Sequence, residues 1–129
     1  VNVIVGNNSY SIQPIEIIDN TLVCYSLGNL LSGHTRIDSR ISAVVDFNIS
    51  LTKEKDKKKI EFKDINVMFT YSYYKDNSNY KVVPFNKITN EFSSCKTYYE
   101  KYKTLLTDGK DYINVYALGD TNGNTEQKG

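Results

Sequence analysis

Two stretches of alternating apolar and polar residues, separated by a highly charged turn, most constrain what this chain can fold into. Residues 43–51 and residues 65–73 both place an apolar side chain at every second position. Alternation with a period of two is typical of a β-strand with one buried face. Residues 53–59 between them are all charged, so we expect a hairpin of two strands with a solvated tip. Ile60 and Phe62 are out of phase with Ile65, which predicts a β-bulge at residues 63–64.

Shorter strands are predicted on either side of this hairpin. A second hairpin turns at Asp19 and Asn20, because both side chains tolerate left-handed backbone geometry. Residues 26–40 mix Gly, Ser and charged residues without a period, and are predicted to form a surface loop. The segments with strand-like composition are residues 1–5, 15–18, 21–25, 80–85 and 112–118.

One helix is predicted, near the C-terminus. Ser93 or Ser94 can cap its start, and Asp108-Gly109 can end it. Its apolar residues recur at spacings of three and four: Cys95, Tyr98, Tyr102, Leu105 and Leu106. Four or more antiparallel strands with one late helix predict a β-dominated α+β fold, a mostly antiparallel sheet with one C-terminal helix.

The chain is predicted to form one domain over residues 1–118, followed by a flexible polar tail at 119–129. It begins inside a strand-like run, so we expect it to be part of a longer protein. The net charge of +1 gives no reason to expect nucleic acid or an anionic membrane as a partner, and no apolar run is long enough to span a membrane. Cys24 is predicted to be a buried apolar residue, and a disulfide between Cys24 and Cys95 remains open.

Three runs near the N-terminus carry a family resemblance. Residues 13–16 read Gln-Pro-Ile-Glu, residues 25–29 read Tyr-Ser-Leu-Gly-Asn, and a Gly-led loop at residues 6–10 follows the first strand. In this order they resemble the C-terminal part of bacterial capsule synthesis proteins of the CapA type, a branch of the calcineurin-like metallophosphatases linked to poly-γ-glutamate. The resemblance spans residues 2–50 and is looser over residues 60–85. It implies the second half of an α/β/β/α sandwich.

The resemblance also implies a pair of divalent metal ions, because the family's loop after the first strand supplies histidines to a two-metal centre. Here the corresponding positions are Asn7, Asn8 and Tyr10, without a histidine. We therefore expect no cofactor for this chain alone, and no catalysis by it alone. By the same resemblance, the parent protein is expected outside a bacterial cell, at the cell surface or anchored to the membrane.

The predicted binding residues are Asn29, at the end of residues 25–29, and His34, Arg36 and Arg40 in the loop that follows. This loop holds both arginines of the chain and its single histidine. A guanidinium group can bind a carboxylate or phosphate with two parallel hydrogen bonds. Since poly-γ-glutamate is a chain of carboxylates, the resemblance makes an anionic polymer or a synthase subunit the expected partner.

Three functions stay open at this point. The first is a fragment of a capsule or poly-γ-glutamate biosynthesis protein that has lost its metal-binding histidines and is not catalytic alone. The second is a non-enzymatic recognition module that binds anionic polymer or a synthase partner. Separately, a tyrosine cluster (Tyr71, Tyr73, Tyr74 and Tyr80) could offer an aromatic face to a glycan or protein partner. The third is half of a metal-dependent phosphohydrolase that an N-terminal part completes.

Overall fold

The fold is α+β and dominated by strands, as the sequence predicts, in a computed structural model that describes residues 1–119 and 127–128. Its elements in chain order are β1 (Val3–Val5), β2 (Ile15–Ile18), β3 (Thr21–Cys24), η1 (Ile37–Arg40), β4 (Ile41–Glu54), β5 (Lys57–Lys75), β6 (Ser78–Pro84), η2 (Phe85–Lys87), α1 (Cys95–Thr107), β7 (Ile113–Tyr116) and β8 (Gln127–Lys128). The tail predicted to be flexible spans residues 119–129, and residues 120–126 and 129 of it lie outside the described residues.

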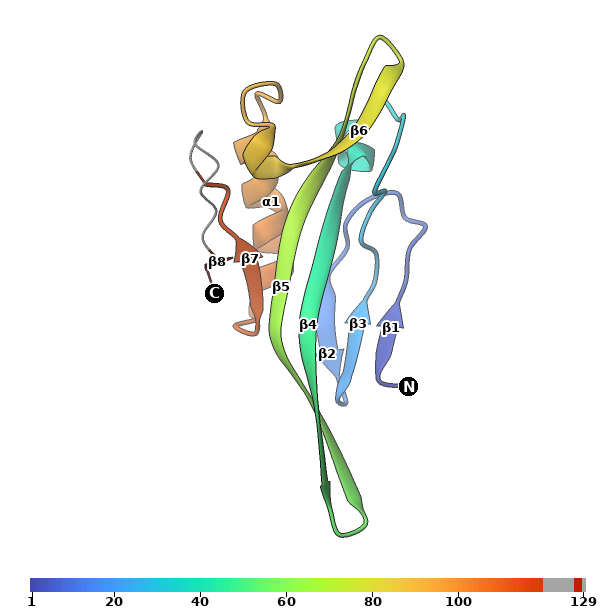
Figure 1. The fold of residues 1–129 in the computed structure, drawn as a ribbon, viewed down its shortest axis with the longest axis vertical. Coiled ribbons are helices and arrows are strands. Elements are labelled where there is room, and N and C mark those ends of the chain that lie inside the picture. Colours follow the sequence, from blue (N-terminus) through green and yellow to red (C-terminus); the bar gives the residue numbers. More distant parts are fainter. Residues whose placement is uncertain (120–126, 129) are drawn as a thin grey trace.

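The strands form two sheets. The smaller has the order β1-β3-β2, with β1 parallel to β3 and β2 antiparallel to it. The larger follows the order β4-β5-β7-β8, and β6 also pairs with β5. Only the β5–β7 pair in the larger sheet is parallel. The smaller sheet lies on the β4 side of the molecule and α1 lies on the β7 side (Figure 1).

The long hairpin confirms the two alternating stretches and the bulge between them. Asp46 pairs with Asn66 whereas Asn48 pairs with Lys63, so β5 holds one more residue than β4 between these pairs. The extra residue lies at the predicted step, where Asp64 takes a positive φ of 54°. The tip is shorter than the predicted one at residues 53–59, because strand pairing continues to Glu54 and Lys57.

Helix α1 presents a slightly different face to the core from the one predicted. Cys95, Tyr99, Tyr102 and Leu106 are buried, whereas Leu105 is exposed and Tyr98 is half-buried. The true stripe advances by four, three and four residues, which keeps it on one side of the helix. Neither predicted serine caps the helix through its side chain: Ser94 is the N-cap residue but makes no such hydrogen bond.

Aromatic side chains from several elements meet at Phe69 in the core. Its ring centroid lies 5.7 Å from that of Phe85, 5.9 Å from that of Tyr99 and 6.2 Å from that of Tyr102. Such tilted and edge-on contacts suit the quadrupoles of the rings. The cluster fastens β5 to η2 and to α1.

Both cysteines are buried and free, and they are not joined in a disulfide. Cys24 lies at the end of β3, as a small core residue, which confirms its predicted role. Burial raises the pKa of the Cys95 thiol to about 11, so this group stays protonated at neutral pH. Cys24 and Cys95 therefore contribute packing and not reactivity.

Candidate functional site

The loop at residues 6–10 and the loop at residues 26–36 meet at one end of the molecule. The rings of Tyr10 and His34 lie 5.6 Å apart, centroid to centroid. Both side chains belong to exposed residues, and 52% of Tyr10 is accessible. The structure thus brings together two predicted site residues that are 24 positions apart in the sequence.

A pair of tyrosines from the β5–β6 hairpin extends this meeting point. The Tyr74 hydroxyl donates a hydrogen bond to the carbonyl oxygen of His34 (3.1 Å). The rings of Tyr74 and Tyr80 lie 4.8 Å apart, and Tyr80 is exposed and packs against Gly33. We call the surface formed by Tyr10, His34, Tyr74 and Tyr80 the aromatic rim. Partly exposed tyrosines in tilted contact, of this kind, are well suited to bind a polar partner.

The two arginines of the loop have different environments. Arg36 is mostly exposed, with 76% of its side chain accessible, and its guanidinium lies 4.0 Å from Asp38. Arg40 is enclosed between the rings of Tyr71 and Tyr74, at 4.6 and 4.2 Å, and donates from Nε to the carbonyl oxygen of Ser72 (3.0 Å). Arg36 is therefore open to an anion, whereas Arg40 holds Tyr74 in place beneath the loop.

Asn7 and Asn29 line a shallow hollow of about 600 Å³ beside β4. Asn7 accepts a hydrogen bond at Oδ1 from the hydroxyl of buried Ser26 (3.2 Å). Asn29 donates from Nδ2 to the carbonyl oxygen of Ser39 (3.1 Å). These two amides hold the loops together. Asn8 is exposed, and its backbone φ of 91° places it in a sharp turn.

Apolar side chains were not predicted at this hollow. Leu30 and Leu31 line it and are 56% and 57% exposed, and Val44 of β4 is 42% exposed. No periodicity in the loop marks the two leucines, so only the path of the chain shows that they flank β4. The hollow is therefore apolar along its wall and polar at Asn7 and Asn29.

A network centred on Asp38 fixes the loop to α1. The Asp38 carboxylate accepts hydrogen bonds from Lys101 Nζ (2.7 Å) and from the Tyr102 hydroxyl. Partial burial alone would raise the pKa of Asp38, but these hydrogen bonds and the charges of Lys101 and Arg36 lower it below its usual range. Burial, with the bond to Asp38, raises the pKa of Tyr102.

This network predicts a pH-dependent stability. The folded pKa of Asp38 lies below the unfolded one, so its contribution is complete above the unfolded pKa and is lost as the pH falls through the folded pKa. We expect Asp38→Asn to lower the free energy of unfolding by about 1–2 kcal/mol at neutral pH. The difference from the wild type should shrink below about pH 4. Urea unfolding across this range measures both values, and a constant difference would contradict the role of Asp38.

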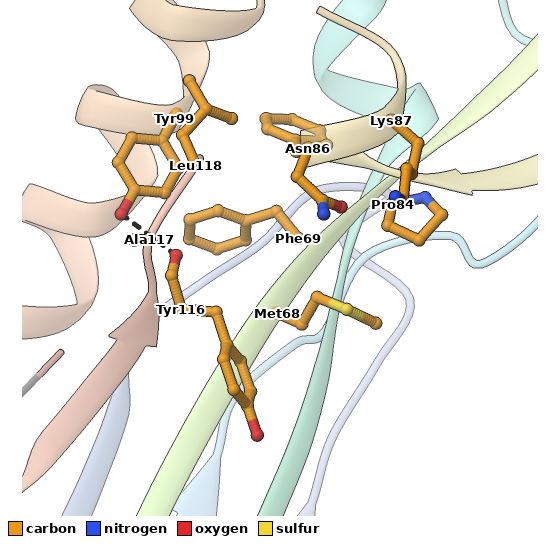
Figure 2. Close-up of a pocket in the computed structure, with 10 residues that line it drawn as sticks. Met68, Phe69, Pro84, Asn86, Lys87, Tyr99, Tyr116, Ala117 and Leu118 are labelled. Carbon is orange, nitrogen blue, oxygen red and sulfur yellow. Dashed lines mark hydrogen bonds between the residues drawn. The ribbon is translucent and has the colours of Figure 1, made fainter. Parts of the chain in front are cut away.

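A second cavity, of about 250 Å³, lies between β5, η2 and the segment after β7 (Figure 2). Phe69 and Tyr99 line it, and the Tyr99 hydroxyl donates to the carbonyl oxygen of Tyr116 (3.0 Å). Lys87 is the one charged residue in its lining. None of the predicted site residues lies there. Its walls are continuous with the aromatic core, so we attribute it to packing.

Metal ligands are sparse in the described chain. Residues 1–119 and 127–128 contain no group of three or more His, Cys, Asp or Glu side chains placed to hold a metal ion. The positions that the predicted resemblance aligns with metal-binding histidines offer an amide oxygen from Asn7, which accepts a hydrogen bond from Ser26, and an exposed amide from Asn8. Amide oxygens suit Ca²⁺ or Mg²⁺ better than Zn²⁺ or Mn²⁺.

Comparison of the chain with protein-family models, with curated proteins and with solved structures identified no match. The resemblance to capsule synthesis proteins predicted from residues 6–10, 13–16 and 25–29 therefore stays a prediction. Within the described residues, no helix is long and apolar enough to cross a membrane.

Proposed function

We propose that this chain is a recognition module of a capsule or poly-γ-glutamate biosynthesis protein, built on a metallophosphatase-like scaffold and not catalytic by itself. The observation that carries the proposal is the contact between Tyr10 and His34, which joins the loop at residues 6–10 to the predicted binding loop. The ligand is an anionic polymer or an acidic segment of a synthase subunit. The parent protein acts at the outside of a bacterial cell.

The surface offers the groups that such a ligand needs. Arg36 is exposed at one side of the loop, and its guanidinium can bind a carboxylate with two hydrogen bonds. His34 and Tyr10 add ring nitrogens and a hydroxyl, and Tyr80 adds an exposed ring. A chain of carboxylates linked by methylene groups would contact both the cation and the aromatic faces.

Binding of labelled poly-γ-glutamate, followed by fluorescence anisotropy, tests this proposal. We expect Arg36→Ala to weaken binding about tenfold, because a hydrogen-bonded charge is lost. Tyr80→Ala should weaken it to a similar extent. Lys110→Ala, which removes the same charge from the turn after α1, is the matched control and should change little. Equal loss in Arg36→Ala and Lys110→Ala would contradict a localised site. Phosphatase activity of the chain alone with Mn²⁺ would contradict the proposal that it is not catalytic by itself.

One observation favours the third of the functions considered above, half of a metal-dependent phosphohydrolase. β1 is an outer strand of the smaller sheet, and Ile4 and Val5 on it are 47% and 62% exposed. Parallel strands are usually covered on both faces. A further polypeptide that packs on β1 would bury these side chains and could supply metal ligands. Phosphatase activity that appears only when such a segment is added would support this candidate over a binding module.

A further inference from the structure

The hairpin β4–β5 continues beyond the body of the protein as a two-stranded arm, residues 48–63. Its strands pair from Asn48 with Lys63 to Glu54 with Lys57. Seven residues per strand correspond to roughly 20 Å of extended chain. Figure 1 shows the arm projecting past the end of the smaller sheet, with no other element beside it. An isolated two-stranded ribbon is only marginally stable in water, so a partner surface is expected.

One face of the arm is apolar. Ile49 pairs with Phe62 and Leu51 pairs with Ile60, so these four side chains share a face. It continues the core-facing side of β4, since the Phe47 ring contacts that of Phe62 at 5.8 Å. Ile49 and Leu51 are nevertheless each 54% exposed. The alternation predicted a half-buried strand here, and the structure shows instead that the apolar pattern runs beyond the core.

The charges of the arm are separated by face. Lys53 pairs with Lys58 directly beyond the apolar residues and on the same face. The carboxylates of Glu54 and Glu61 belong to the opposite face, where Glu61 binds Lys59 at 2.8 Å. In the described part of the chain Lys53 and Lys58 form no ion pair. Two like charges directly across a strand pair destabilise it, so an anionic partner would stabilise this end of the arm.

We propose that this face of the arm docks on an anionic lipid surface. Ile49 and Leu51 would enter the boundary between headgroups and acyl chains, while Lys53 and Lys58 would extend to the lipid phosphates. The net charge of +1 conceals this feature, because residues 53–63 alone carry six lysines against three carboxylates. The inference is independent of the proposed function, since it uses none of the residues of the aromatic rim.

The geometry favours lipid over a protein occupant. An arm about 20 Å long and about 10 Å wide offers roughly 200 Å² on one face, well below the 800 Å² or so per partner of a typical stable protein interface. A second copy of the arm would bring no carboxylate to Lys53 and Lys58, because that face carries only cations and apolar groups. A lipid interface requires only an apolar strip with cations beside it.

Flotation of the full chain with phosphatidylcholine vesicles, with and without phosphatidylglycerol, tests the proposal. We expect binding only to the anionic vesicles. Lys53→Gln with Lys58→Gln should lower the partition coefficient about thirtyfold, since each lysine near an anionic surface strengthens binding about fivefold. Ile49→Ser with Leu51→Ser should also abolish most binding, and circular dichroism would show that the fold remains.

The matched control is Lys57→Gln with Lys59→Gln, which removes the same charge from the opposite face of the arm. It should lower partitioning by less than about threefold, through the general surface potential alone. Equal losses in the two double variants would overturn the proposal, because they would show attraction without a docking face. Equal binding to neutral and anionic vesicles would also overturn it. Absence of binding to both would overturn it in favour of a protein partner.

Discussion

Replacement of Phe69 by alanine is expected to lower the free energy of unfolding by about 3–5 kcal/mol, as large aromatic truncations in packed cores do. Phe69 is only 2% exposed, and its ring contacts Phe85, Tyr99 and Tyr102. Its loss would leave a void where β5, η2 and α1 meet, beside the existing cavity of about 250 Å³. Urea unfolding followed by tyrosine fluorescence would measure the change.

Phe62→Ala is the matched control for this experiment. It removes the same atoms from the same strand, but Phe62 lies on the arm and is only half-buried. We expect Phe62→Ala to lower the free energy of unfolding by less, about 1.5 kcal/mol, because part of the Phe62 side chain stays in contact with water in the folded protein. If the two variants lost the same stability, the core would not be centred on Phe69.

Gly28→Ala is expected to lower the free energy of unfolding by about 2–3 kcal/mol, the range typical of strained or overpacked backbone positions. Gly28 has a φ of +77°, and a Cβ there would lie 2.4 Å from the carbonyl oxygen of Ile41. To relieve this contact the loop must move away from β4. That movement would weaken the hydrogen bond from the Ala43 N–H to the carbonyl oxygen of Leu27 (2.8 Å).

Gly109→Ala separates the two causes of this effect. Gly109 has a similar φ of +68°, but a Cβ would meet no atom within 4 Å. Gly109→Ala should therefore lower the free energy of unfolding by about 1 kcal/mol, the cost of holding a residue with a Cβ in left-handed backbone geometry. The difference between the two variants in thermal or urea unfolding measures the contact of Gly28 with β4. If both variants lost the same stability, the loop around Gly28 would be able to move away from β4 without loss of stability.

The sequence predicts the local elements of this fold well. Alternation locates β4 and β5 because successive side chains of a strand point to opposite faces, so a strand with one buried face carries an apolar residue at every second position. Turn chemistry locates the hairpin at Asp19 and Asn20, which both adopt positive φ. The bulge at Asp64 follows from a change of phase that can be counted along the chain.

Long-range arrangement is less accessible from the sequence. That Tyr10 meets His34, or that Arg40 lies between Tyr71 and Tyr74, depends on how two sheets pack. Neither contact has a signature at fixed spacing. The exposure of Ile49 and Leu51 could not be predicted either, because alternation reports which side chains share a face and not whether another element covers that face.

The length of β5 has a mechanical consequence. This single strand of 19 residues runs from the tip of the arm at Lys57 to Lys75, next to Tyr74 of the aromatic rim. An extended strand resists stretching, so a load applied at Lys57 is carried along the backbone to the far end of the molecule. The bulge at Asp64 interrupts the ladder between arm and body, and it is the natural pivot about which the two could bend.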